Sequence, residues 1–270
     1  MNTTERAIAD IQQHGYTRIP RVFDDDTVAR TLATVQTLSA DLADKPIRDI
    51  PRLDTGQHTV YNLQNKSLDC IKLLLGEATI RSVLMHFLND SWHRQIPQGD
   101  PNYILRSYSA RDNRVAAPMH IDSFIPYQGD LAVSMQVAIV LEDQNTQNGC
   151  TTVIPGSHQN GEYVSQDEAA NATPIESTAG DVVIWDSRIW HGTLENRTGA
   201  SRWSLIATFV RWWVKQGYDI TGKLPQAIYE QLTDNEKAIL GFCSIPLGDE
   251  FAGIDFKKGY DWLKPRVSDY

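Results

Sequence analysis

Cysteine is scarce in this sequence, and neither long apolar runs nor basic blocks occur in it. The 270 residues include three cysteines, which lie far apart and form no Cys-x-x-Cys pair. This spacing argues against a disulfide framework or a zinc–thiolate site and favours a reducing compartment. No stretch approaches the roughly 18 apolar residues of a membrane span, and charges interrupt the opening segment where a signal peptide is apolar. We therefore expect a cytoplasmic protein without a membrane partner.

Signatures of several common functions are missing as well. The formal net charge is −9, and no cluster of lysine and arginine suits a nucleic-acid backbone. The sequence has no Gly-x-Ser-x-Gly nucleophile segment and no glycine-rich phosphate loop. Cys150 has no basic neighbour that would activate it as a nucleophile. These absences argue against nucleic-acid binding, serine or cysteine nucleophilic catalysis and phosphate-loop nucleotide binding.

The first part of the chain has the periodicity of helices. We predict a helix that ends near Gly15, a strand over 16–19, a helix that begins near Asp24, and a helical region over 68–88 that is broken near Gly76. A further helix over 225–240, followed by a loop-rich tail, closes the chain. No repeat or linker separates these segments, so we expect one domain over 1–270.

From about Tyr103 the sequence changes to short runs rich in β-branched and aromatic residues, separated by turn residues. The predicted strands are 103–108, 131–141, 151–155, 181–185 and 204–213. Several short strands behind a helical N-terminal region predict a mainly β protein with flanking helices. Its core would be a double-stranded β-helix of the jelly-roll or cupin-like type, over about 103–214.

His120 and Asp122 form a His-x-Asp pair. Side chains two apart on an extended chain lie on one face, so an imidazole and a carboxylate can reach the same metal ion. With seven histidines and 34 acidic residues, about one His-x-Asp or His-x-Glu pair is expected by chance. The pair therefore needs support from elsewhere in the sequence.

His191 and Arg202 supply that support. An apolar run from Gly180 leads to His191, and eleven residues later Arg202 precedes the next apolar strand. An arginine at the start of a core strand is costly to bury unless it meets an anion, and its planar fork suits a carboxylate. Two histidines and one carboxylate leave three positions open on an octahedral iron, as in non-haem Fe(II) oxygenases.

These motifs, taken together, resemble the phytanoyl-CoA dioxygenase family of 2-oxoglutarate-dependent oxygenases. The resemblance covers about 103–214 and lies in His120-Ile121-Asp122, in the segment 148–158 (NGCTTVIPGSH), in Gly180-Asp181 and in 191–202 (HGTLENRTGASR). It implies Fe(II) held by His120, Asp122 and His191, with 2-oxoglutarate and O2 as further reactants. Related halogenases lack the carboxylate, so Asp122 implies oxygen transfer, desaturation or cyclisation.

The resemblance also implies how the cosubstrate is bound. Arg202 matches the arginine that pairs with the C5 carboxylate of 2-oxoglutarate, and Thr193 matches a hydroxyl residue that assists it. Gln136 lies near a position beside the cosubstrate, although the match needs a two-residue gap. The cofactors expected are therefore Fe(II), 2-oxoglutarate and O2.

The substrate is expected to be a small molecule, and the resemblance implies hydroxylation of an unactivated C–H bond in secondary-metabolite biosynthesis. Candidate substrate contacts are Arg114, Tyr127 and Trp213. No basic groove of the size of coenzyme A is evident, which argues against phytanoyl-CoA itself. Two alternatives stay open: a non-catalytic jelly-roll module that binds a ligand, and a zinc-dependent enzyme on the same fold. The second gives Arg202 no role.

Overall fold

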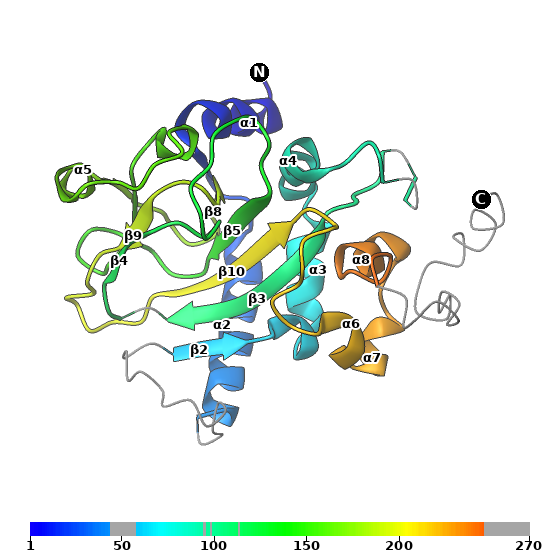
Figure 1. The fold of residues 1–270 in the computed structure, drawn as a ribbon. Coiled ribbons are helices and arrows are strands. Elements are labelled where there is room, and N and C mark those ends of the chain that lie inside the picture. The colour runs from blue at the N-terminus through cyan, green and yellow to red at the C-terminus, as the bar shows by residue number, and fades with distance from the viewer. Residues whose placement is uncertain (44–57, 94–95, 98, 113, 246–270) are drawn as a thin grey trace.

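The computed structural model describes residues 1–43, 58–93, 96–97, 99–112 and 114–245. Within them, two antiparallel sheets face each other (Figure 1). The larger sheet has the order β1 (Tyr16–Ile19), β8 (Val182–Asp186), β5 (Ser134–Val140), β10 (Trp203–Val210), β3 (Ile104–Asp112) and β2 (His58–Tyr61). The smaller sheet has the order β4 (Ala117–His120), β9 (His191–Thr193), β6 (Thr151–Val153) and β7 (Thr173–Ile175).

Helices of the N-terminal region cover the outer face of the larger sheet (Figure 1). They are α1 (Thr3–His14), α2 (Asp25–Asp41), α3 (Leu68–Gly76) and α4 (Ala78–Leu88). Shorter helices follow: α5 (Gln166–Ala170), α6 (Ile220–Lys223), α7 (Gln226–Tyr229) and α8 (Asp234–Ile239), with single 3-10 turns at Leu63–Asn65 and Ser157–Gln159. This arrangement confirms the predicted fold class, a jelly-roll core with a helical N-terminal region.

The strands of the larger sheet divide their side chains between two environments. Along β10, Leu205, Ala207 and Phe209 are fully buried in the core that the sheet shares with the helices. Ser204 and Ile206 alternate with them and point to the space between the two sheets. Because side chains alternate along a strand, the outer face holds the apolar core and the inner face is available for a site.

Local signals explain most of the helix boundaries. The side chain of Asn2 caps α1, and Gly15 ends it in the left-handed conformation that glycine adopts most readily (φ 86°). Asp24 caps α2 through the backbone N–H of Thr27. The helical region 68–88 divides after Gly76, as predicted, because Glu77 has extended dihedrals and caps α4.

Two expectations need correction. The helix predicted over 225–240 is wrong as a single element: it is divided into α7 and α8, because Thr233 forms a capping box with Glu236 that starts a new helix. Strands outside the predicted set also occur, and β2 extends the larger sheet beyond the predicted core. The predicted tail after residue 245 lies outside the described residues. No helix in the described part of the chain is long and apolar enough to cross a membrane.

Candidate metal and cosubstrate site

The structure brings His120, Asp122 and His191 together at the opening of the two sheets. His120 ends β4 and His191 begins β9, and the two residues are direct partners in the antiparallel register. One ligand atom from each of the three side chains can be chosen so that all three lie within 4.8 Å of one another. Asp122 Oδ2 is 3.4 Å from His191 Nε2, and Asp122 Oδ1 is 3.8 Å from His120 Nε2. This is the spacing of atoms that can share one metal ion.

Backbone carbonyls fix the orientation of both imidazole rings. The Nδ1 atom of His120 is 2.8 Å from the carbonyl oxygen of Pro118, and Nδ1 of His191 is 3.0 Å from that of Ile189. Because a carbonyl can only accept, each Nδ1 is the donor, and each Nε2 is directed toward Asp122. Two Nε2 atoms and a carboxylate then face one another, an arrangement that suits a cation between them. The donor set therefore fits a divalent metal ion.

Asp122 is held in place by the turn between β8 and β9. The backbone N–H groups of Asp122 and Ser123 both donate to the carbonyl oxygen of Ser187, at 2.8 and 3.0 Å. Burial opposes ionisation of the Asp122 carboxyl, but the hydrogen bond and charge of His191, with smaller contributions from His120 and Arg111, outweigh it. The pKa of Asp122 therefore lies below its usual range, so the group is an anion at neutral pH.

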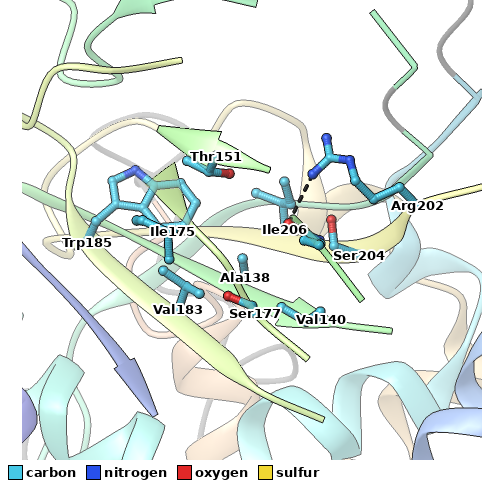
Figure 2. A pocket seen from close by; sticks show the side chains of 11 residues that line it. Ala138, Val140, Thr151, Ile175, Ser177, Val183, Trp185, Arg202, Ser204 and Ile206 are labelled. Carbon is cyan, nitrogen blue, oxygen red and sulfur yellow. Dashed lines mark hydrogen bonds between the residues drawn. The ribbon is translucent and has the colours of Figure 1, made fainter. Parts of the chain in front are cut away.

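A pocket lies between the sheets, next to the metal-type cluster of His120, Asp122 and His191. Figure 2 shows Trp185 at one end of this pocket and Arg202 at the other. The Trp185 ring lies 5.5 Å from that of His191, centroid to centroid, so the pocket begins beside the cluster. The indole Nε1 of Trp185 and the hydroxyl of Ser177 are buried without a hydrogen-bond partner among the described residues. These two polar atoms indicate that the pocket takes a polar ligand.

Arg202 is 2% exposed and lines the far end of the pocket. Its Nη1 donates to Gln144 Oε1 at 3.0 Å, and its backbone N–H donates to Asp112 Oδ1. Burial lowers the pKa of the guanidinium to about 10, which leaves it protonated at neutral pH. A buried, charged guanidinium at the end of a pocket that is otherwise lined by apolar and uncharged polar residues suits the carboxylate of a keto acid.

Thr193 and Gln136 lie on the inner faces of the two sheets. Thr193 follows His191 by two residues on β9 and pairs with Thr151, which lines the pocket. Gln136 is buried opposite Trp185, where its Oε1 accepts from the hydroxyl of Thr208 and its Nε2 lies 3.3 Å from Ser187 Oγ. Both residues lie on the side of their strands that the predicted cosubstrate contacts require.

The three candidate substrate residues have different surroundings. Arg114 donates from Nε to Asp112 Oδ2 at 2.9 Å. The ring of Tyr127 lies under the guanidinium of Arg188, at 4.7 Å, and its hydroxyl accepts from the N–H of Val133. Trp213 is half exposed just after β10. Arg114 and Tyr127 thus have structural partners, and a substrate role for any of the three stays a prediction.

Sequence reasoning missed a buried ion pair that supports the site. Arg188 binds Asp186 through two nitrogens, Nε at 3.0 Å and Nη2 at 2.7 Å, and its Nη1 donates to the carbonyl of Gly129. Burial opposes the charge of Arg188, but Asp186 outweighs it and raises the pKa. The pair therefore ties the turn before His191 to the segment that follows Asp122. The signal for this pair in the sequence is the segment Asp-Ser-Arg between two apolar runs. Opposite charges that are buried two residues apart favour an ion pair.

We expect an Arg188→Met substitution to lower the free energy of unfolding by about 3–5 kcal/mol, because it leaves the Asp186 carboxylate buried without its partner. Denaturant unfolding monitored by circular dichroism measures this difference. Adding Asp186→Asn to the Met variant is the matched control, and it should recover part of the loss. A loss below about 1 kcal/mol for Arg188→Met would show that the pair contributes little.

A jelly roll that gathers two imidazoles and one carboxylate at its opening, with a buried guanidinium deep in the adjoining pocket, has the architecture of a mononuclear non-haem metal enzyme. Comparisons with known proteins give the family. The family model described as phytanoyl-CoA dioxygenase matches residues 11–204. The chain belongs to the phytanoyl-CoA dioxygenase family, and the prediction from the motifs is confirmed.

Relatives in other organisms are similar to part of the chain or to most of it. A Mycobacterium bovis protein, Mb1539, is 30% identical over 112 residues, which are 41% of this chain and 41% of the relative. The chain thus matches about two fifths of the length of that relative. Dioxygenase af480 of Aspergillus fumigatus is 26% identical over 260 residues, covering 89% of this chain and 78% of the relative.

Solved structures share the fold. The epimerase SnoN, crystallised with Fe3+, alpha ketoglutarate and nogalamycin RO, superposes with a TM-score of 0.59 at 23% identity, over 77% of this chain and 83% of SnoN. At this identity the likeness concerns the fold. The His–Asp–His set of this chain agrees with the cofactors expected from the sequence, Fe(II) and 2-oxoglutarate.

Proposed function

We propose that this protein is an Fe(II)- and 2-oxoglutarate-dependent oxygenase that hydroxylates an unactivated C–H bond of a small molecule, as in secondary-metabolite biosynthesis. The observation that carries the proposal is the facing set of His120 Nε2, Asp122 and His191 Nε2, with each Nδ1 engaged by a carbonyl. With Fe(II), 2-oxoglutarate and O2 bound, such a centre couples decarboxylation of the keto acid to oxidation of the substrate.

In this proposal the protein itself contributes placement and charge. His120, Asp122 and His191 hold the metal on one side and leave its other positions to ligands. Arg202 binds the distal carboxylate of 2-oxoglutarate through its fork, Thr193 adds a hydroxyl, and Gln136 lies beside the cosubstrate. Arg202 lines the pocket at the end away from Trp185, and the Trp185 ring lies beside that of His191, so a keto acid anchored at Arg202 would extend toward the cluster.

Anaerobic titration tests the proposal. We expect Fe(II) followed by 2-oxoglutarate to produce a weak visible charge-transfer band at one equivalent of each, and we expect air to yield succinate. A zinc-dependent enzyme would bind Zn(II) and turn over without the keto acid. A binding module would bind neither Fe(II) nor 2-oxoglutarate tightly. Either of these results would contradict the proposed function.

A further inference from the structure

The inner face of β3 carries two arginines, Arg111 and Arg106. Side chains directly opposite each other on neighbouring antiparallel strands share a face. Arg111 pairs with Ser204 and Ser109 pairs with Ile206, and both of these β10 residues line the pocket. Arg111 and Ser109 therefore point into the space between the sheets, where Arg111 Nε donates to Ser109 Oγ at 3.1 Å.

A β-bulge brings Arg106 to the same face. Arg106 and Arg111 are five residues apart, so a regular strand would direct them to opposite faces. The register between β10 and β3 shifts between Thr208, which pairs with Ser107, and Phe209, which pairs with Leu105. Arg106 is the extra residue of this bulge. Since Leu105 packs in the core on the helix side, Arg106 turns to the inner face.

Both arginines lie close to the segment that contains Asp122. The guanidinium carbon of Arg106 is 5.3 Å from the ring centroid of Phe124, two residues beyond Asp122. Phe124 is 73% exposed and has φ 66°, a conformation that a residue with a Cβ rarely adopts. An exposed aromatic ring held in this conformation beside a candidate metal ligand indicates a ligand contact. The charge of Arg111 reaches Asp122 itself.

The ion pairs of the described residues do not include these two arginines. Arg18, Arg114 and Arg188 each contact a carboxylate within ion-pair distance. Among the described residues, no carboxylate lies within 4.0 Å of the guanidinium of Arg106 or Arg111. Acidic residues outnumber basic ones in this chain, 34 to 25. Two cations on an inner face, without a carboxylate partner among the described residues, suit an anionic ligand.

We infer that Arg106 and Arg111 form an anion subsite for the substrate, which is a small organic acid whose apolar part packs on Phe124. This inference rests on the proposed function for the identity of the reacting centre. It narrows the substrate class: the oxidised C–H bond belongs to a molecule with a carboxylate, phosphate or sulfate group. The arginines fix that group, and the distance from it to the metal selects the carbon that is oxidised.

Binding of a charged and an uncharged probe of the same shape tests the inference. We expect 3-phenylpropionate to bind at least about tenfold more tightly than 3-phenylpropanamide, by calorimetry on the full chain with and without Fe(II) and 2-oxoglutarate under anaerobic conditions. The Arg106→Met and Arg111→Met variants should each bind the acid about tenfold more weakly than the wild type does. Their affinity for the amide should be unchanged. The Arg106→Lys variant should keep part of the preference for the acid over the amide. Arg197→Met, an exposed arginine of the β9–β10 loop, is the matched control and should have no effect.

The outcomes separate this inference from the proposed function. Equal binding of acid and amide, absence of binding by 3-phenylpropionate, phenyl phosphate and phenyl sulfate alike, or unchanged affinities in both Met variants would overturn the subsite. A Met variant that binds 2-oxoglutarate more weakly, but binds 3-phenylpropionate as tightly as the wild type does, would assign the arginines to the cosubstrate. This result would overturn the subsite as well. Selective binding of the acid by a protein that shows no Fe(II)–2-oxoglutarate band would support the subsite and overturn the proposed function.

Discussion

An Asp122→Ala variant is expected to lose substrate oxidation to below about 0.1% of the wild-type rate. The carboxylate is the one anionic member of the cluster, and the N–H groups of Asp122 and Ser123 fix its position on the Ser187 carbonyl. Its removal leaves two imidazoles, which supply no negative charge to a divalent ion and only two of the three coordinating groups. The measurement is succinate formed together with oxidised product under saturating Fe(II) and 2-oxoglutarate.

Folding has to be separated from chemistry in this experiment. Circular dichroism of the variant should match the wild type, because Asp122 is partly exposed and its backbone bonds do not depend on the side chain. Glu195→Ala, at an exposed carboxylate in the loop after β9, is the matched control and should keep full activity. Near-normal succinate coupled to product in the Asp122 variant would show that another group completes the centre.

Replacing Arg202 by Met should raise the KM for 2-oxoglutarate more than about 30-fold. Truncating one partner of a buried, hydrogen-bonded charge pair costs about 2–5 kcal/mol, and the 30-fold figure corresponds to the lower end of that range. Methionine preserves much of the apolar stem but removes the fork at the end of the pocket. The kinetic readout is the KM for 2-oxoglutarate measured apart from kcat, with the substrate saturating.

Two further measurements make this prediction specific. Arg202→Lys keeps the charge but loses the two-pronged geometry, so its KM should lie between those of the wild type and the Met variant. The affinity for Fe(II) should change little, because Arg202 lies at the opposite end of the pocket from Trp185 (Figure 2), whose ring is the one beside His191. An unchanged KM for 2-oxoglutarate in the Met variant would remove Arg202 from cosubstrate binding.

Much of the fold could be predicted from the sequence because its signals are local. The apolar stripe of α2, the cap at Asp24 and the break after Gly76 depend on neighbouring residues alone. The short runs from Tyr103 onward predicted five strands of the jelly roll. Strands of three or four residues, such as β7, carry too few alternating positions to stand out.

The site was predictable where its residues follow a motif and unpredictable where they depend on distant partners. The His120–Asp122 pair indicated a metal site only in combination with His191, and the structure brings the three residues together. No glycine or proline flanks Arg106, so nothing in the nearby sequence indicates a bulge. The face of the sheet to which its side chain points could therefore not be predicted. The stacking of Tyr127 on Arg188 depends on residues 61 positions apart, which sequence spacing does not reveal.

The two environments along β10 have a consequence for how this scaffold can change over evolution. Ser204 and Ile206 border the pocket, whereas Leu205 and Ala207, which alternate with them, pack the sheet against its helices. Stability and selectivity are thus assigned to alternate residues of a single strand. New specificities can arise at every second position while the intervening residues preserve the scaffold, so tolerance to mutation along β10 should rise and fall with a period of two.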